Sequence, residues 1–456
     1  MTDIDIAVVG AGIAGLTTAY RLAREGHRVE VFESGDEPGG RMRAARVDGY
    51  TIDRGAETLS PYGYPATWEF IEELGLARQD RLHRIEHPVG LWSQGRAHPW
   101  VGHPRSLLTG AGLSWRGRLQ LLRMLVAGNG RGRVDPDRPE RSAHGDMTLA
   151  EFGRRHGDEL VERCLGPVAT AAFGWLPERS TAAPMLAIMQ GTRGIYRWQT
   201  YRDGQDTMAR TLAERLKVHL SKPVTRVERD GRGGGRGGGE GGRGVRLSFA
   251  DGTELTARAA VLTLPAPEIA AIHPGAPEEE RRFLDAATFT TMIRVGVMLD
   301  RPLEPRRTAR QPHLYAFVMA PWEDSLLSGG TCEHNKCPHR VPPGRGLVTL
   351  LVSPRRAAEV YDLPDDQVLE RVLDESERFI DGMRAAYVGH QVTRWRHGLP
   401  EATPEALRLR APFTRRPAGP IEYAGDWLYL RPSSEAAIAS SRLAVDRVHA
   451  WLRDGG

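Results

Sequence analysis

The stretch Ile4-Asp-Ile-Ala-Val-Val-Gly-Ala-Gly-Ile-Ala-Gly15 decides the fold of this chain. Residues 4–9 are mostly apolar and predict a short buried strand, whereas residues 13–25 repeat apolar side chains at helical spacing. Gly26 ends the helix, and residues 28–33 predict a second strand. A strand, a helix and a strand within about 30 residues form a βαβ unit with a right-handed crossover.

Three glycines stand between the first strand and the first helix, where a dinucleotide-binding fingerprint must lie. Gly10 allows the tight turn, Gly12 leaves room for a pyrophosphate, and Gly15 lets the helix pack closely on the strand. The start of the helix presents free N–H groups and a positive dipole end to the phosphates. Glu33 ends the second strand, where a carboxylate accepts hydrogen bonds from the adenosine ribose. The alternative is a glycine-rich turn in an unrelated α/β protein.

A second glycine pair, Gly39-Gly40, precedes Arg41 and follows closely after Glu33. The pair favours FAD over NAD, because the longer cofactor needs another close approach of the backbone and Arg41 can pair with its pyrophosphate. Taken alone, the same residues could form an ordinary turn that carries a surface arginine.

Composition limits the class of protein. The 456 residues suggest two or three domains, and a chain with 40% hydrophobic and 26% charged residues is not disordered as a whole. The net charge is +4, with both signs spread along the chain, so we expect no nucleic-acid partner. The lysines are Lys217, Lys222 and Lys336, which leaves few amines for catalysis.

The cysteines indicate a reducing compartment, because Cys164, Cys332 and Cys337 are an odd set in a long chain. The pattern Cys332-x-His334-x-x-Cys337-x-His339 matches no usual zinc spacing, so we expect no metal. The sequence shows neither a signal peptide nor a run of about 18 apolar residues. The predicted location is therefore the cytoplasm.

Beyond the βαβ unit, helical and β regions alternate. Residues 65–200 are expected to be mostly helical, and strands at 218–228 and 245–264 flank a glycine-rich loop at 230–244, to which we assign no function. Further strands are expected at 290–300, 315–319, 347–352 and 421–424, and further helices at 365–386 and 434–452.

Three more short segments complete the pattern: Asp53-Arg-Gly55, Ala424-Gly-Asp-Trp427 and Ser434-Glu-Ala-Ala-Ile438. Together with the glycine motifs, they resemble the superfamily of flavin amine oxidases, protoporphyrinogen oxidases and carotenoid desaturases. The resemblance spans nearly the whole chain. Two middle segments, residues 157–167 and 203–212, are most similar to the protoporphyrinogen oxidase branch.

The resemblance implies an α/β fold in two discontinuous domains. A Rossmann-type FAD-binding domain would comprise residues 1–60, 205–275 and 405–456. A mixed α+β substrate domain would comprise residues 61–204 and 276–404. The active site would lie between the domains, at the flavin ring.

The resemblance also assigns FAD-binding roles beyond the fingerprint. Gly425 and Asp426 would lie near the ribityl and phosphate groups, and the last helix would point its first turn at the isoalloxazine. Val224 would touch the adenine, and Leu264 would close on the dinucleotide. The full set expected to bind FAD non-covalently is Gly10, Gly12, Ile13, Ala14, Gly15, Glu33, Ser34, Gly39, Gly40, Arg41, Met42, Val224, Leu264, Gly425, Asp426, Glu435, Ala436, Ala437 and Ile438.

The chain departs from the amine oxidases on the substrate side. Arg294 stands where those enzymes have a lysine that holds a water near flavin N5, and an arginine cannot be deprotonated to run the same relay. Arg294 is either a structural residue or an anchor for an anionic substrate group. The aromatic rings that hold the amine are replaced by Ser433 and, near Pro400, by Glu401 and Ala402.

Few residues qualify for catalysis. In flavin chemistry the protein positions the substrate and supplies at most one base. His397 is the candidate base, although a lone histidine is more often structural. Trp395, Trp427 and Tyr429 lie near the same face, and packing is the plainer interpretation of each. The candidate catalytic residues are therefore Arg294, His397 and Trp395.

The expected activity is FAD-dependent dehydrogenation of a C–C or C–N bond in an extended, hydrophobic or polycyclic small molecule. Hydride would pass to flavin N5, with O2 as the acceptor. The alternatives are an amine oxidase and, from another class, a non-redox flavin-dependent isomerase or carrier.

Residues 114–126 form a basic amphipathic helix that begins near Trp115. Such a helix would let a cytoplasmic enzyme touch a membrane and admit a lipophilic substrate. The plainer alternative is a solvated helix over the core.

Overall fold

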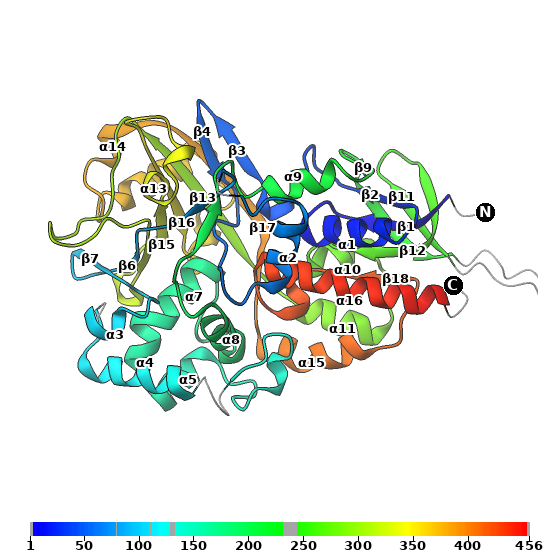
Figure 1. Cartoon of the computed structure of the whole chain (residues 1–456), viewed down its shortest axis with the longest axis horizontal. Helices are drawn as coiled ribbons and strands as arrows, with labels where there is room; N and C mark the ends of the chain where they lie inside the picture. Colours follow the sequence, from blue (N-terminus) through cyan, green and yellow to red (C-terminus); the bar gives the residue numbers. More distant parts are fainter. Residues whose placement is uncertain (1–2, 79, 110–111, 128–132, 231–243, 454–456) are drawn as a thin grey trace, which may run out of the picture.

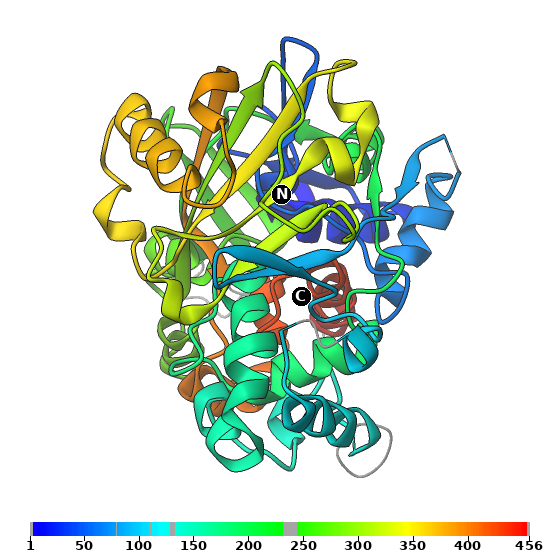
Figure 2. The same ribbon diagram turned by 90° about the vertical axis from the view of Figure 1, so that its left-hand side faces the viewer.

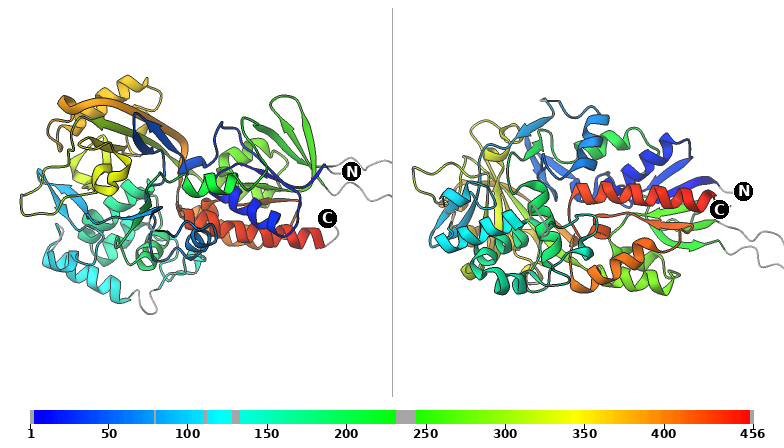
Figure 3. Two further views of the ribbon diagram at one scale, coloured as in Figure 1. Left: turned by 45° about the horizontal axis from the view of Figure 1, so that its top comes forward. Right: turned by 60° about the horizontal axis from the view of Figure 1, so that its bottom comes forward.

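The computed structural model describes residues 3–78, 80–109, 112–127, 133–230 and 244–453. Within these residues the chain forms two lobes, each built around a seven-stranded sheet. The left view of Figure 3 separates the lobe near the marked chain ends from the larger second lobe. Most of the glycine-rich loop, residues 231–243, lies outside the described residues.

The first sheet contains β1 (Ile4–Val9), β2 (Val29–Phe32), β9 (Val218–His219), β10 (Val224–Arg229), β11 (Val245–Phe249), β12 (Glu254–Leu262) and β18 (Ile421–Tyr423). Its order is β10-β11-β12-β1-β2-β9, with β18 beside the end of β12. β1 runs parallel to β2 and β12, and β12 runs parallel to β18. Because Val9 is in register with Phe32 and Leu262, the loops that follow these strands meet at one edge.

Helices from distant parts of the chain pack on this sheet. Figure 1 shows α16 lying alongside α1, and the two helices are in contact. On α1, Leu16, Ala19 and Leu22 are fully buried, and each large apolar side chain buried in this way contributes about 1.5–3 kcal/mol. The helices of this lobe are α1 (Ile13–Arg24), α2 (Pro65–Glu73), α9 (Thr207–Ala213), α10 (Ala266–Ile272), α11 (Glu278–Ala286), α15 (Pro404–Arg415) and α16 (Ser434–Arg453).

The second sheet contains β6 (Val89–Ser93), β7 (Arg96–Pro99), β13 (Phe289–Leu299), β14 (Ala316–Met319), β15 (Leu327–Cys332), β16 (Gly346–Val352) and β17 (Tyr387–Pro400). Its order is β17-β13-β16-β15-β14-β6-β7, and its pairs are antiparallel except for β6 with β14. Val295 and Leu350 of this sheet share one core with Val372 of α13 (Asp365–Ser376).

A helical layer completes the second lobe. Figure 2 shows these helices, coloured cyan to green, below the strands of the second sheet. η3 within it is a π-helical turn. The layer consists of α3 (Ser106–Thr109), α4 (Trp115–Ala127), α5 (Leu149–His156), α6 (Asp158–Leu160), η3 (Val161–Leu165), α7 (Gly166–Phe173) and α8 (Ala182–Thr192).

Several short elements complete the two lobes or lie between them. β3 pairs with β4, β5 pairs with β8, and the other short elements are single helical turns. They are η1 (Gly40–Met42), β3 (Ala44–Val47), β4 (Tyr50–Asp53), β5 (Leu82–Arg84), β8 (Gln199–Tyr201), α12 (Glu333–Lys336), η5 (Pro338–Arg340), α14 (Met383–Ala386) and η7 (Asp426–Tyr429).

The α/β fold predicted from the sequence is confirmed. Two local predictions were wrong, and one strand was missed. The region 65–200 also contains β5, β6 and β7, whose three to five residues are too short to show a period. No strand was predicted where β17 lies. The expected helix at 365–386 is two helices, because α13 ends at Ser376 and the left-handed Gly382, with φ +83°, precedes the short α14. The exact domain boundaries stay a prediction.

Candidate functional site

The first helix begins at the carboxyl edge of the first sheet without a cap. Gly12 is its N-cap residue, no side chain caps it, and its first turn contains no acidic residue. Ile13 and Ala14 are buried, with exposed fractions of 7% and 5%. A buried helix end normally has partners for its free N–H groups, and its positive dipole end attracts an anion. The start of α1 is therefore fit to hold a phosphate.

The three fingerprint glycines have different surroundings. Gly10 adopts a φ of +105°, which favours glycine. A Cβ atom on Gly15 would lie 2.0 Å from the carbonyl oxygen of Gly10, so Gly15 is needed for close packing. A Cβ atom on Gly12 would meet nothing within 4 Å. Gly12 thus borders open space at the helix start, as a pyrophosphate site requires.

Glu33 lies beside this helix start. Its carboxylate accepts the N–H groups of Ala11 at 2.7 Å and Gly35 at 2.8 Å, and the Ser34 hydroxyl lies 3.3 Å from it. The Lys222 N–H donates to the Glu33 carbonyl at 2.8 Å and so brings the start of β10, with Val224, to the same edge. A carboxylate has about four lone-pair sites, so Glu33 keeps capacity for ribose hydroxyls.

The second glycine pair folds back on the fingerprint. The Gly39 N–H donates to the Ala11 carbonyl at 2.8 Å, and η1 with Met42 follows. Arg41 then forms a bidentate pair with Asp426, with N–O distances of 2.8 and 2.9 Å. The sequence predicted separately that Arg41 and Asp426 would lie near the phosphates, and the fold places them in contact.

The last helix contributes a buried first turn. Ala436, Ala437 and Ile438 are buried there, and the Gly425 N–H donates to Ser440 Oγ at 2.8 Å. Near them, the carbonyl of Leu264 accepts a hydrogen bond from the Trp427 indole at 3.2 Å.

The Glu435 side chain contacts a second helix. Its carboxylate accepts the N–H groups of Ala66 at 3.1 Å and Thr67 at 2.8 Å and so caps α2. Burial raises the pKa of Glu435, against the effect of these hydrogen bonds. No local pattern indicates this role, because the capped helix lies 369 residues away.

Arg294 is held by neighbouring groups. It donates to the Gly55 carbonyl at 2.7 Å and forms an ion pair with Glu57. Burial would raise the pKa of Glu57, but the charges of Arg294 and Lys336 lower it. With a carboxylate already bound, Arg294 fits the structural alternative better than the substrate-anchor alternative.

The same ion pair belongs to a larger buried cluster that sequence reasoning missed. Three acidic and three basic side chains lie together where β4, β13, α12 and η5 meet. The signal that could have pointed to it is Lys336, a lysine in a chain that uses almost none. The cluster consists of Asp53, Glu57, Glu333, Arg294, Lys336 and Arg340.

Trp395 and His397 lie on β17, on the same side of the site as Arg41. The Trp395 indole donates to the Arg54 carbonyl at 2.8 Å, and the Arg43 guanidinium lies 5.2 Å from the ring centre. His397 Nδ1 lies 3.1 Å from Glu268 of α10. The Gly398 carbonyl, which follows His397 on β17, accepts a hydrogen bond from Arg41 at 2.9 Å.

The residues that replace the amine-binding aromatic rings make structural contacts. Ser433 Oγ accepts the Ala436 N–H at 3.2 Å and so caps α16. Glu401 is buried and lies 3.2 Å from Arg179 and 2.8 Å from the Thr288 hydroxyl. Trp427 is fully buried against Phe283 and is a packing residue.

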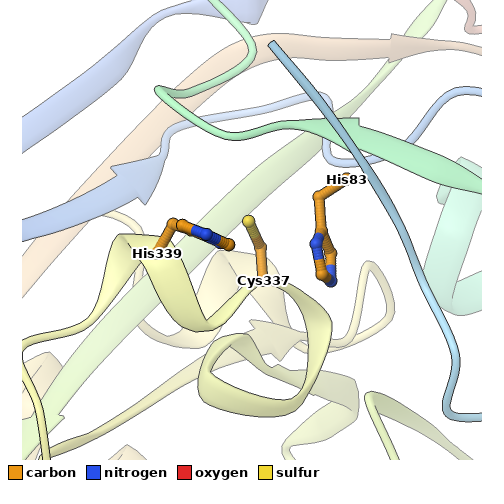
Figure 4. A group of neighbouring side chains, drawn as sticks. All are labelled: His83, Cys337 and His339. Carbon is orange, nitrogen blue, oxygen red and sulfur yellow. The ribbon is translucent and has the colours of Figure 1, made fainter. Parts of the chain in front are cut away.

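A group of three potential metal ligands lies away from this site. Figure 4 shows His83 of β5 beside Cys337 and His339, and their ligand atoms lie within 4.8 Å of one another. Cys332 and His334, which the sequence pattern grouped with Cys337 and His339, lie outside this group.

The charges around this group disfavour a cation. Arg202 Nη1 lies 3.2 Å from His339 Nε2. Burial raises the pKa of Cys337 and so disfavours the thiolate that a metal would need. We therefore assign no metal to these three side chains.

The sequence matches the family described as flavin containing amine oxidoreductases over residues 13–449. The chain belongs to this family. It is therefore a flavin-dependent oxidoreductase, and the resemblance drawn from the motifs is confirmed.

Relatives of this flavin oxidoreductase span most of its length. Coproporphyrinogen III oxidase of Propionibacterium freudenreichii subsp. freudenreichii is 27% identical over 461 residues, which cover 87% of this chain and 81% of the relative. Coproporphyrinogen III oxidase of Bacillus subtilis (strain 168) is 20% identical over 434 residues, 87% of each chain. The solved structure of a putrescine oxidase triple mutant matches this chain with a TM-score of 0.77 and 17% identity. The match covers 98% of this chain and 99% of that one, and at this identity it establishes only a shared fold.

A helix that crosses a bilayer must be long and continuously apolar. Over the described residues, each helix is too short or too polar to cross a bilayer.

Proposed function

We propose that this oxidoreductase binds its flavin as FAD, without a covalent bond. The start of α1 would hold the pyrophosphate, and Glu33 would bind the ribose. The second glycine pair, followed by the Arg41–Asp426 contact, supports the longer dinucleotide. The three cysteines lie outside the segments assigned to the cofactor, which supports non-covalent binding.

We further propose that the enzyme dehydrogenates a C–C or C–N bond of an extended, polycyclic substrate of the porphyrinogen class, with O2 as the acceptor. The observation that carries this proposal is the use of Ser433 and Glu401 at the positions of the amine-binding rings. The two relatives from Propionibacterium freudenreichii and Bacillus subtilis are both named coproporphyrinogen III oxidases.

The chain's own residues would then position the substrate and handle a proton. When bound, the flavin supplies the hydride acceptor. Arg294, fixed by Gly55 and Glu57, would shape the wall of the site. His397 stays our proposed base, because its contact with Glu268 would orient the ring.

The test is anaerobic mixing of the flavin-loaded enzyme with coproporphyrinogen III. We expect loss of the visible absorption of oxidised flavin and, in air, release of peroxide with appearance of porphyrin fluorescence. Putrescine serves as the comparison substrate. Faster flavin reduction by the amine would support the amine oxidase alternative, and turnover without flavin reduction would support the isomerase alternative.

We also propose that α4 docks a cytoplasmic enzyme on an anionic membrane surface. Four apolar side chains, at spacings of four, three and four residues, form one exposed stripe along the helix. Arg116 and Arg123 are exposed beside this stripe. The stripe consists of Trp115 (68% exposed), Leu119 (38%), Leu122 (45%) and Val126 (65%).

Replacement of Leu122 by glutamate should weaken binding to phosphatidylglycerol vesicles about tenfold or more, because a buried leucine contributes about 1.5–3 kcal/mol. Co-sedimentation with the vesicles measures this change. The matched control is Leu220→Glu, a leucine of similar exposure (39%) outside α4, which should bind like the wild type. Equal binding by Leu122→Glu and wild type would contradict the docking surface.

A further inference from the structure

One buried basic side chain differs from the others. Within the described residues, five arginine and lysine residues are buried, and four of them lie within 4.0 Å of a carboxylate. Arg431 is 6% exposed, has no carboxylate within that distance among the described residues, and its Nε lacks a hydrogen-bond partner there. The four paired residues are Arg294, Lys336, Arg340 and Arg410.

A buried cation without a carboxylate is costly, because desolvation of the charge is not compensated. Such a charge points to a partner from outside the chain, because a buried polar group without a partner is rare in folded proteins. The nearest acidic residue along the chain, Glu435, already accepts two N–H groups of α2. The structure therefore offers Arg431 no strong internal partner in the part of the chain it describes.

The backbone holds Arg431 firmly at the candidate site. It follows η7 and precedes α16, and its N–H donates to the Asp426 carbonyl at 3.3 Å. The preceding residue, Leu430, is fully buried in a left-handed conformation with φ +49°. A non-glycine residue in this region costs roughly 1–2 kcal/mol, and such strain clusters at functional sites.

The groups around Arg431 suit an anion. Its charge acts on Tyr64 and on Glu435. Burial raises the pKa of Tyr64 to about 12, against the opposing effect of Arg431. Tyr64 thus stays protonated at neutral pH and can donate a hydrogen bond. The first turn of α16 adds free N–H groups and the positive end of its dipole.

We infer that Arg431 anchors a carboxylate group of the substrate, an inference that rests on the function proposed above. A guanidinium offers a planar pair of donors that matches a carboxylate in bidentate fashion. Arg431 has no carboxylate within 4.0 Å among the described residues, so its charge would repel the ammonium form of an amine. This anchor takes the role that the sequence offered to Arg294, which already holds Glu57.

The first test compares coproporphyrinogen III with its methyl ester, which keeps the ring and removes the carboxylates. Arg431→Gln should raise KM for the acid about 10- to 100-fold, because hydrogen bonds to charged groups are lost. The KM for the ester should change little. Arg431→Lys should recover part of the loss. A similar change for acid and ester would overturn the inference, even where the wild type oxidises both.

A second test needs no turnover and so separates this inference from the proposed function. Benzoate is titrated into the flavin-loaded protein, and the visible flavin spectrum reports binding. We expect wild type to bind benzoate at least tenfold more tightly than Arg431→Gln, with equal flavin content in both. If wild type did not bind benzoate, or if both proteins bound it equally, Arg431 would not anchor a carboxylate. If Arg431→Gln lost its flavin, the partner of Arg431 would be the cofactor and not the substrate, which would also overturn the inference.

Discussion

Replacement of Gly12 by valine should abolish cofactor binding while the fold remains intact. Gly12 has an extended backbone (φ −71°, ψ 173°) that a β-branched residue adopts readily, and its Cβ position meets nothing within 4 Å. The protein thus accepts the side chain without strain. The new methyl groups would occupy the space at the start of α1 where the pyrophosphate belongs. We expect FAD affinity to fall by at least about 100-fold, or roughly 3 kcal/mol.

Gly15→Ala is the matched control. It changes the same motif, but its new side chain crowds the protein itself instead of the space for the cofactor. Its Cβ would lie 2.0 Å from the Gly10 carbonyl oxygen and 2.7 Å from the Thr263 hydroxyl. Overpacking of this kind costs about 1–3 kcal/mol or more. Gly15→Ala should therefore lower both the thermal midpoint of the flavin-free protein and its affinity for FAD.

Two measurements distinguish the glycine variants: thermal unfolding of the flavin-free proteins and titration with FAD followed by flavin fluorescence. Gly12→Val should unfold at the wild-type midpoint. If Gly12→Val bound FAD as tightly as wild type, the helix start would not hold the cofactor. If it unfolded like Gly15→Ala, the space beside Gly12 would be needed by the protein itself.

The first lobe was largely predictable from the sequence, because its signals are local. The apolar run at β1, the glycines and the helical period of α1 lie within one short segment, so residue type alone indicates their place. The contact between Arg41 and Asp426 was not predictable from spacing, since 385 residues separate them. The sequence indicated a phosphate partner for Arg41 and for Asp426 separately. The fold shows that the two side chains also contact each other.

The second lobe was less predictable. β17 is its longest strand, but its buried residues do not alternate, so it gives no period of two. The ion pairs of the arginines could not be predicted either, because an arginine-rich sequence does not indicate which guanidinium contacts a carboxylate. Arg294 and Arg431 look alike in sequence, yet one is bound to Glu57 and the other has no such partner among the described residues. Tertiary contacts decide these roles.

Asp53→Asn should destabilise the protein by about 3–5 kcal/mol, because it removes one charge from a buried ion cluster. Asp53 is 1% exposed, accepts the Gln205 N–H at 2.9 Å, and pairs with Arg340 and Lys336. Asparagine has the same shape as aspartate but no negative charge, so the buried cations Arg340 and Lys336 lose one of their carboxylate partners. The loss would appear as a lower urea midpoint of the flavin-free protein, monitored by tryptophan fluorescence.

Asp203→Asn is the surface control for this prediction. The Asp203 side chain is 55% exposed and lies 3.4 Å from Arg81, so its loss should cost less than about 1 kcal/mol. The double variant Asp53→Asn/Arg340→Met extends the test, because it removes the stranded guanidinium and replaces it with an apolar side chain.

The double variant should be more stable than Asp53→Asn alone, since an apolar side chain replaces a buried charge at little cost. This outcome would show that the cluster is held together by mutual compensation of charge between β4 and the second lobe. Two outcomes would mean that water or backbone dipoles compensate Arg340. In the first, the free energy of unfolding of Asp53→Asn lies within about 1 kcal/mol of the wild-type value. In the second, the loss in the double variant equals the sum of the losses in the two single variants. The joint between the lobes, and with it the position of Arg294 beside Gly55, would then depend on packing alone.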